Sequence, residues 1–252
     1  MNPIPNAEQT ESVNGIQMHY AIEGEGEPLV LLHGFTGAGA DWKHIFPVPP
    51  EGHRLIMPDL RGHGRTTNPS GAFTFVQCAM DVLALLDKLG VHHCKAMGMS
   101  GGGQTLLHMA TMQPGRVEAI VLISTAHYFP AQAREIMRQM TEETRSSEDW
   151  EVMRQRHHQG DDQIRALWRQ GHAFKDSHDD VNFTPASLGT ITARTLIVHG
   201  DQDPLYPLDI ANEMAVAIPR SQLWVMPGGG HCSIFGPHTP AFLEKAMPFL
   251  QG

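Results

Sequence analysis

The sequence predicts an α/β fold in which a mostly parallel β-sheet is covered by helices on both faces. Six short apolar segments alternate with segments of helical periodicity. The apolar segments lack the alternation of polar and apolar residues that half-exposed strands show. The length of 252 residues accommodates one such domain with an insertion. Regular alternation of strand and helix indicates parallel strands joined by right-handed crossovers.

Six buried strands are expected, and an antiparallel hairpin precedes them. The expected strands are Pro28–Leu32, Leu55–Asp59, Lys95–Met99, Ala119–Ile123, Thr195–His199 and Gln222–Met226. The segment Glu11–Tyr20 alternates polar and apolar residues around Asn14-Gly15, a pair that favours a tight hairpin turn. The hairpin is expected to form an antiparallel edge of the sheet.

Four helices are expected to cover this sheet. They span Phe75–Leu89, Gln104–Gln113, Leu208–Ala217 and Pro240–Leu250. The first helix ends before Gly90, because glycine favours the left-handed conformation that terminates helices. Four apolar residues fall on one face of this helix: Val76, Met80, Leu83 and Leu86.

Residues 127–186 contain no clear strand and are rich in Arg, Gln, Glu, His and Met. This segment is far longer than a single crossover requires. We expect two or three amphipathic helices that form a cap over the carboxyl edge of the sheet, where open α/β sheets bind ligands. The alternative is ordinary crossover helices in a larger sheet. The favoured division is a core of residues 1–126 and 187–252 and a cap of residues 127–186.

Composition disfavours several classes of partner. The chain has 18 basic and 27 acidic residues, and its formal charge of −9 repels nucleic-acid backbones and anionic membranes. Cys78, Cys94 and Cys232 are widely spaced without a C-x-x-C motif, so a reduced, cytoplasmic setting and no metal site are expected. No signal peptide is expected at the N-terminus, and no apolar run is long enough to span a bilayer.

The segment 98–102 reads G-M-S-G-G and matches G-x-S-x-G, with Ser100 at its centre. It lies between a predicted strand and a predicted helix, the context of a nucleophile elbow that exposes a serine hydroxyl on a strained turn. Gly98, Gly102 and Gly103 leave room for the strand and the helix. A glycine-rich turn of this kind can also bind phosphate, but the spacing of a dinucleotide-binding loop and a P-loop lysine are absent.

A serine nucleophile needs a general base, and His231 follows the last predicted strand in a glycine-rich loop. By itself, one loop histidine among sixteen would carry no such role. Asp201 and Asp203 follow the preceding strand, and either could orient the histidine or cap the next helix. The order serine, aspartate, histidine, each just beyond a strand, is far more specific than its parts.

Two backbone amides are expected to stabilise the oxyanion of an acyl-transfer intermediate. One is the N–H of Gly101, directly after the serine, and the other is the N–H of Phe35, in the loop after the first buried strand. His33 in the same loop is expected to be structural. We expect two pairs of adjacent histidines to be solvated, His92-His93 and His157-His158.

With these motifs the chain resembles the α/β-hydrolase fold superfamily along nearly its whole length. The segments that carry the resemblance are His33–Phe35, Asp59–Gly64, Gly98–Gly102, Gly200–Asp203 and Gly230–His231. The resemblance implies that Ser100 is the nucleophile and His231 the general base. The G-x-x-D pattern of the family selects Asp203 over Asp201.

Two positions depart from the pattern of this family. The residue after the nucleophile is often bulky there, and Gly101 in its place implies a roomier or more mobile acyl pocket. The residue before the nucleophile is often histidine or another large side chain, and here it is Met99, which still packs as an apolar group.

Specificity is expected to come from the cap. Its apolar side chains could line a pocket or form the core of the cap, and the second interpretation is favoured for most of them: Tyr128, Phe129, Met137, Met140, Trp150, Met153, Trp168 and Phe174. The residues assigned to substrate binding are Phe35, Met99, Tyr128, Phe129 and Trp168. Four arginines could bind a substrate carboxylate, but solvated pairing with nearby acids is favoured: Arg154, Arg156, Arg165 and Arg169.

The expected activity is hydrolysis of a small carboxylic ester or lactone through an acyl-serine, as in carboxylesterases, without a metal or organic cofactor. In this superfamily, haloalkane dehalogenases and epoxide hydrolases use an aspartate nucleophile, so Ser100 disfavours both. Alternatives are a C–C bond hydrolase, perhydrolase, aminopeptidase or hydroxynitrile lyase, or a slow-turnover small-molecule receptor. A degraded, purely structural member is the weakest alternative. The expected partner is a small ester-like molecule, and the oligomeric state is left open.

Overall fold

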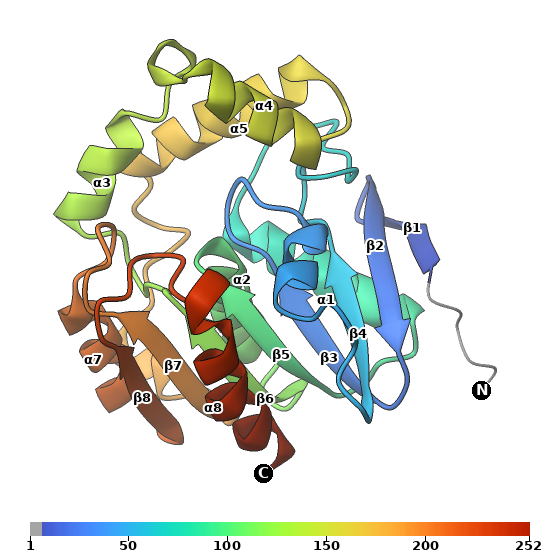
Figure 1. The fold of residues 1–252 in the computed structure, drawn as a ribbon, viewed down its shortest axis with the longest axis vertical. Coiled ribbons are helices and arrows are strands. Elements are labelled where there is room, and N and C mark those ends of the chain that lie inside the picture. The colour runs from blue at the N-terminus through green and yellow to red at the C-terminus, as the bar shows by residue number, and fades with distance from the viewer. Residues whose placement is uncertain (1–6) are drawn as a thin grey trace.

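A computed structural model describes residues 7–252 as an eight-stranded sheet with helices on both faces (Figure 1). The strand order is β1-β2-β4-β3-β5-β6-β7-β8; β2 is antiparallel to β1 and β4, and β3 to β8 run parallel. The strands are β1 (Ala7–Val13), β2 (Ile16–Gly24), β3 (Glu27–Leu32), β4 (His53–Pro58), β5 (Cys94–Met99), β6 (Val117–Ile123), β7 (Arg194–Gly200) and β8 (Ser221–Met226). The predicted mostly parallel sheet with an antiparallel hairpin at its edge is confirmed.

The helices follow the predicted alternation. They are α1 (Phe75–Lys88), α2 (Gly101–Met112), α3 (Ala131–Arg138), α4 (Ser147–Arg156), α5 (Asp161–Ala173), α6 (Pro185–Leu188), α7 (Leu208–Ala217) and α8 (Thr239–Gln251). Four short 3₁₀ turns join them: η1 (Gly39–His44), η2 (Glu142–Thr144), η3 (Phe174–Asp176) and η4 (Gly236–His238). Helix α2 begins three residues earlier than predicted, because the turn at Ser100 leads directly into it.

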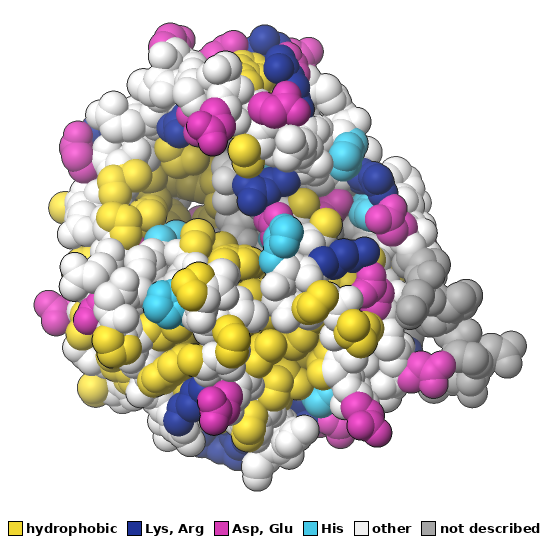
Figure 2. Space-filling view, viewed as in Figure 1, with side chains coloured by type: hydrophobic (Ala, Val, Ile, Leu, Met, Phe, Trp, Pro, Cys, Tyr) yellow, Lys and Arg dark blue, Asp and Glu magenta, His cyan; other side chains and the backbone are white. Residues whose placement is uncertain are grey.

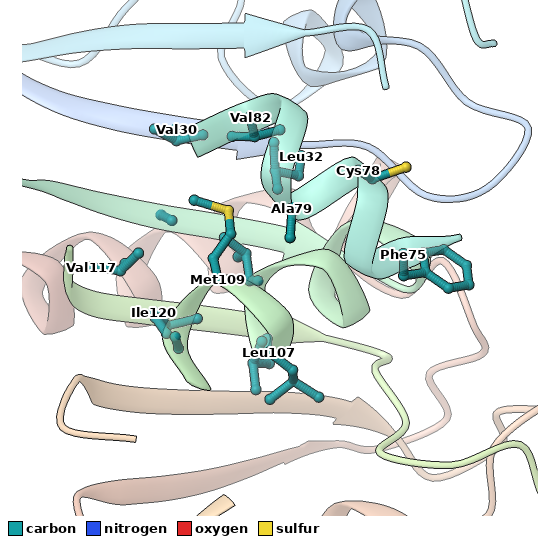
Figure 3. Close-up of a cluster of buried hydrophobic side chains, with 14 of the residues drawn as sticks. Val30, Leu32, Phe75, Cys78, Ala79, Val82, Leu107, Met109, Val117 and Ile120 are labelled. Atoms are coloured by element: carbon teal, nitrogen blue, oxygen red, sulfur yellow. The ribbon is translucent and has the colours of Figure 1, made fainter. Parts of the chain in front are cut away.

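Separate apolar cores cover the two faces of the sheet. Helices α1, α2 and α7 pack on one face, where side chains of β3 and β6 such as Leu32 and Ile120 meet α1 and α2 (Figure 3). The turn η1 and helix α8 pack on the other face through Trp42 and Phe242. The sheet is therefore buried on both sides, which explains its continuous apolar strands.

The buried face of α1 differs from the predicted one. Met80 was assigned to the apolar face, but its side chain is 44% exposed, whereas Cys78 and Ala79 are fully buried. These two side chains pack in the same core as β3 and α2 (Figure 3). Small side chains at the contact allow a helix to pack closely, and hydrophobic periodicity alone does not reveal this preference.

The helices α3, α4 and α5 form a layer of their own above the sheet (Figure 1). Part of this layer has a small separate core of Met153, Ile164, Leu167 and Trp168. We propose that these helices constitute the cap, with the division at residues 127–186 that the sequence indicates.

His157, at the end of α4, joins this helical layer to two loops of the sheet. Its Nδ1 accepts a hydrogen bond from the Gly64 amide at 2.9 Å, and its Nε2 lies 3.1 Å from the Thr36 carbonyl oxygen. Because Nδ1 accepts, Nε2 carries the proton and the ring is neutral. His157 is buried and only the side chain of His158 is exposed, so the expectation that both are solvated is wrong for His157.

Two further buried histidines hold the loop that contains Phe35. His63 Nε2 accepts from the Thr36 amide at 3.1 Å, and His33 Nε2 accepts from the Leu60 amide at 2.9 Å. The ring of His63 contacts the rings of both His33 and His157, with centroid distances of 5.1 and 5.9 Å. Burial lowers the pKa of all three histidines, that of His157 to about 4. The structural role expected for His33 is confirmed.

A buried ion pair fixes the loop after β4 against α1. Arg61 donates through Nε and a terminal nitrogen to the two carboxylate oxygens of Asp81, at 2.8 and 2.9 Å. The Asn14 and Gln77 amides add bonds of 3.0 Å to the same carboxylate. Since a buried charge requires such partners, the network connects the hairpin turn, α1 and the loop that carries His63.

Asp81→Ala should lower the free energy of unfolding by about 3–5 kcal/mol, because Arg61 is left buried without its counter-charge. Chemical denaturation of wild type and variant measures this difference. The matched control is Asp87→Ala on the same helix: the Asp87 carboxylate is exposed, and its pair with Arg116 contributes less than about 1 kcal/mol. Equal losses in the two variants would contradict the role of the network.

The folded protein should lose stability as the pH falls from about 6.5 to about 4, and His157 should cause part of this loss. In that range His157 binds a proton in the unfolded state but stays neutral in the folded state, where it is buried. This proton stabilises the unfolded state relative to the folded state by about 3 kcal/mol. Chemical denaturation at several pH values should give a shallower decline for His157→Gln than for wild type. His158→Gln should keep the full decline, and an unchanged slope in His157→Gln would disprove the assignment.

Candidate active site

Ser100 lies on a strained turn between β5 and α2. Its φ is +49° and its ψ −114°, and its amide donates to the Ile123 carbonyl at 2.8 Å. A Cβ on Gly98 would lie 2.6 Å from the Gly102 backbone, and a Cβ on Gly102 would lie 2.2 Å from the Leu32 oxygen. Glycine is therefore required at both positions, and the turn is held as a nucleophile elbow requires.

The loops after β7 and β8 bring Asp203 and His231 together. His231 Nδ1 lies 2.8 Å from one Asp203 carboxylate oxygen, and the other oxygen accepts from the amides of Leu205 and Tyr206 at 2.8 and 3.1 Å. Burial alone would raise the pKa of Asp203, but the bonds to His231 and the two amides hold it below its usual value. Ionised Asp203 thus retains the proton on His231 Nδ1 and leaves Nε2 as the base.

Asp201, the other acid considered, does not reach His231. Its carboxylate accepts from the Gly228 amide at 2.7 Å and so connects the loops after β7 and β8. The structure therefore brings together Asp203 and His231, the pair that the G-x-x-D pattern selects.

Tyr206 touches Ser100, Asp203 and His231, and no sequence motif singles it out. Its amide bonds Asp203, its ring lies edge-on to the His231 ring at 5.3 Å, and its hydroxyl is a polar neighbour of Ser100. The Gln104 side chain donates to the Tyr206 hydroxyl at 3.2 Å. Burial raises the pKa of Tyr206, so the hydroxyl stays protonated. Gln104 is one helical turn after Ser100, a spacing that could have revealed it.

The two predicted oxyanion amides are neighbours. A Cβ built on Gly101 would lie 3.2 Å from the Phe35 nitrogen, which places the two backbone segments side by side. Within residues 7–252, neither amide donates to a protein acceptor. Gly101 also begins α2, where the helix dipole favours negative charge. Two unpaired donors beside Ser100 fit the predicted oxyanion hole.

A cavity of about 360 Å³ contains Ser100 and His231. Most of its walls are apolar, from Phe35, Phe75, Phe129, Ile136, Met137, Met140, Phe174 and Leu205. In Figure 2 the surface is hollowed between the upper helices and the sheet, with hydrophobic side chains around the hollow. A cavity of this size and lining suits a small organic ligand.

The space beside Gly101 is taken by another side chain, and the roomier or more mobile acyl pocket expected from this glycine stays a prediction. The ring of Phe75 fills the space beside this glycine, because a Cβ there would lie 2.9 Å from Phe75 Cε1. Phe75 in turn stacks on Phe174 at 5.2 Å between ring centroids. Phe75, the first residue of α1, thus takes the space that a side chain at position 101 would occupy, although the two residues are distant in sequence.

Of the five predicted substrate-binding residues, Phe35 and Phe129 line the cavity that contains Ser100. The other three, Met99, Tyr128 and Trp168, do not. Trp168 packs against Trp150 within the helical layer, with ring centroids 4.5 Å apart. Tyr128 forms an isolated bridge with Asn182. The assignments of Tyr128 and Trp168 are corrected accordingly.

Met99 lines a second, neighbouring cavity of about 270 Å³, together with Cys232 and Phe235. Strand side chains alternate in direction, so the residue before Ser100 points away from the first cavity. Phe35 borders both cavities.

Three of the cap arginines are paired with acids, as the sequence favours. Arg154 lies 2.8 Å from Asp161, and Arg165 and Arg156 lie 3.1 Å from Glu142 and Asp41. Another arginine, Arg145, lines the cavity of Ser100.

Within residues 7–252, no cluster of His, Cys, Asp and Glu forms a metal site, and no helix is long and apolar enough to span a membrane.

Comparisons with known proteins extend over both halves of the chain. A family model described as the alpha/beta hydrolase fold matches residues 27–149, and a model described as TAP-like protein matches residues 175–251. Epoxide hydrolase 3 of Siraitia grosvenorii is 34% identical over 118 residues, which are 46% of this chain and 37% of that protein. The first curated relatives are thus matched over less than two fifths of their length.

Two further proteins match nearly the whole chain at lower identity. The 2-hydroxy-6-oxo-6-(2'-aminophenyl)hexa-2,4-dienoic acid hydrolase of Metapseudomonas resinovorans is 22% identical over 96% of this chain and 90% of that protein. The solved structure of the enol-lactonase from Burkholderia xenovorans LB400 has a TM-score of 0.80 at 21% identity, covering 97% of this chain and 100% of that one. The sheet, the serine elbow and these matches agree, and the chain belongs to the α/β-hydrolase fold superfamily.

Proposed function

We propose that the chain is a serine hydrolase that cleaves a small carboxylic ester or lactone through an acyl-serine. The observation that carries this proposal is the 2.8 Å contact of Asp203 with His231 in a cavity that also contains Ser100 on its strained turn. Nucleophile, base and orienting acid are the three parts that acyl transfer from serine requires.

In the acylation step, Ser100 Oγ attacks the carbonyl carbon while His231 Nε2 takes the hydroxyl proton. The carbonyl oxygen becomes an oxyanion, which the amides of Phe35 and Gly101 stabilise. The bond between the carbonyl carbon and the alcohol oxygen then breaks, and the alcohol leaves with the proton from His231. Asp203 stabilises the imidazolium during both transfers.

In the deacylation step, His231 removes a proton from water, whose oxygen attacks the acyl carbon. The new tetrahedral oxyanion uses the same two amides. The bond to Ser100 Oγ breaks, His231 returns its proton to that oxygen, and the carboxylic acid leaves. The Tyr206 hydroxyl, next to Ser100, is placed to stabilise negative charge on Oγ as this bond breaks.

The resemblances support this class of reaction in different degrees. The enol-lactonase has an ester-type bond in its named substrate class and shares the fold across the whole chain. Epoxide hydrolase 3 matches less than half of the chain, and the family resemblance assigns such enzymes an aspartate where this chain has Ser100.

C–C bond hydrolysis is the second candidate, because the dienoic acid hydrolase of Metapseudomonas resinovorans matches over 96% of this chain. The same triad could serve such a reaction, so the fold does not distinguish it from ester hydrolysis. A slow-turnover receptor is a third possibility that turnover measurements separate from both.

Ser100→Ala should lower the kcat for p-nitrophenyl esters by at least about 10⁴-fold, with a much smaller change in KM, since the nucleophile is lost. The measurement is steady-state release of p-nitrophenol from an acetate-to-decanoate series by wild type and variant. Asp201→Asn, which alters the acid that does not reach His231, is the matched control and should keep the triad intact.

Full activity in Ser100→Ala would refute the proposed mechanism. Release of a single equivalent by wild type would favour a receptor over an esterase. Failure with every ester in a folded protein would direct attention to C–C cleavage.

A further inference from the structure

Arg145 is the one arginine in the wall of the cavity that contains Ser100, within the part of the chain described. It follows the turn η2 in the segment between α3 and α4, and its side chain is half-buried. One terminal guanidinium nitrogen donates to the Gln139 carbonyl at 2.8 Å. This bond orients the guanidinium against the backbone of the turn.

The Nε–H of this guanidinium has no partner in the part of the chain that the structure describes. The nitrogen is also buried. Because the protein encloses Nε, a ligand oxygen in the cavity would be bound by the terminal nitrogens of the guanidinium.

The hydrogen bonds of the neighbouring acids go to other residues, although the pKa of Asp149 is lowered first by Ser146 and also by the nearby charge of Arg145. Glu142 pairs with Arg165 at 3.1 Å, and Asp149 accepts from the Ser146 amide and hydroxyl at 2.8 and 2.9 Å. Of the described residues that line the cavity, none is Asp or Glu. The positive charge of Arg145 therefore faces a largely apolar cavity that supplies no counter-ion.

The other cap arginines differ in this respect. Arg154, Arg156 and Arg165 each have a carboxylate within 3.1 Å. Arg138, on the adjacent helix α3, is exposed and pairs with Glu135. A positive charge in the cavity wall without a carboxylate in ion-pair contact is thus a property of Arg145 and is not shared by these four residues.

We propose that Arg145 binds a carboxylate on the acid portion of the substrate, which is therefore a monoester of a dicarboxylic acid or the corresponding lactone acid. This inference rests on the proposed function, because it assigns the charge to the acyl-enzyme. The charge is assigned to the acyl portion because the acyl group stays bonded to Ser100 after the alcohol has left, so a carboxylate on it can stay bound through both steps. A guanidinium fork matches the two oxygens of a carboxylate.

The apolar walls complete the recognition. A methylene chain between the reacting carbonyl and the terminal carboxylate would lie against Met137, Met140 and Phe174. These side chains exclude water, and the charge-assisted bonds at the end of the chain become stronger as a result.

The first test compares mono-p-nitrophenyl adipate with p-nitrophenyl hexanoate, which has the same chain length without the carboxylate. Wild type should favour the adipate in kcat/KM by at least about 10-fold, and Arg145→Gln should lower kcat/KM for it by about 10- to 100-fold. The hexanoate should change by less than about 2-fold. Arg145→Lys should retain part of the preference, and Arg138→Gln, the matched exposed control, should retain all of it.

The second test needs no turnover. Calorimetry measures monomethyl adipate binding to Ser100→Ala and to the double variant Ser100→Ala/Arg145→Gln, and the double variant should bind at least about 10-fold more weakly. Equal binding would overturn the role of Arg145. If neither p-nitrophenyl ester is hydrolysed, the proposed function fails while calorimetry still decides the role of Arg145. If both esters are hydrolysed with an unchanged ratio in Arg145→Gln, only the inference about Arg145 fails.

Discussion

The turn at Ser100, with φ at +49°, joins the end of β5 to the first residue of α2 without an intervening loop. This conformation is unfavourable for a residue with a side chain, and it persists because Gly98 and Gly102 allow strand and helix backbones to approach within distances that a Cβ would block. The consequences reach the whole site: the hydroxyl is presented at the edge of the sheet, and the amide of Gly101 is left free beside Phe35. The loops after β7 and β8 then supply the orienting acid Asp203 and the base His231.

Those features that depend on local sequence could be predicted. Continuous apolar runs indicated the parallel strands, and the Asn14-Gly15 pair indicated the hairpin, because each depends on the conformational preferences of a few adjacent residues. Positions just beyond neighbouring strands predicted an acid beside His231 but left Asp201 and Asp203 open, and the G-x-x-D pattern of the family resemblance selected Asp203. The carboxyl ends of parallel strands share one edge of the sheet, so sequence order is enough to bring the two loops together, but not to choose between the two acids.

What depends on packing between distant segments could not be predicted. Phe75 fills the space beside Gly101 that the departure from the family pattern left unassigned. His157 lies buried between two loops of the sheet, although its adjacency to His158 suggested that both are solvated. Trp168 and Tyr128 resembled pocket residues because large apolar side chains occur both in pockets and in small cores. Arg145 differs from Arg154 and Arg165 in lining the cavity of Ser100 without a carboxylate in contact, and this is a property of the folded arrangement and not of the local sequence.

The central claim is that Ser100 is an activated nucleophile whose reactivity depends on His231. It is tested most directly with an alkyl fluorophosphonate, in which the serine oxygen forms a bond to phosphorus as fluoride leaves. The account predicts one phosphonate per chain by intact mass, located on Ser100 by peptide mapping, and labelling that is slowed by orders of magnitude in His231→Ala. No adduct on a folded protein, an adduct on another residue, or equal labelling of His231→Ala would contradict it.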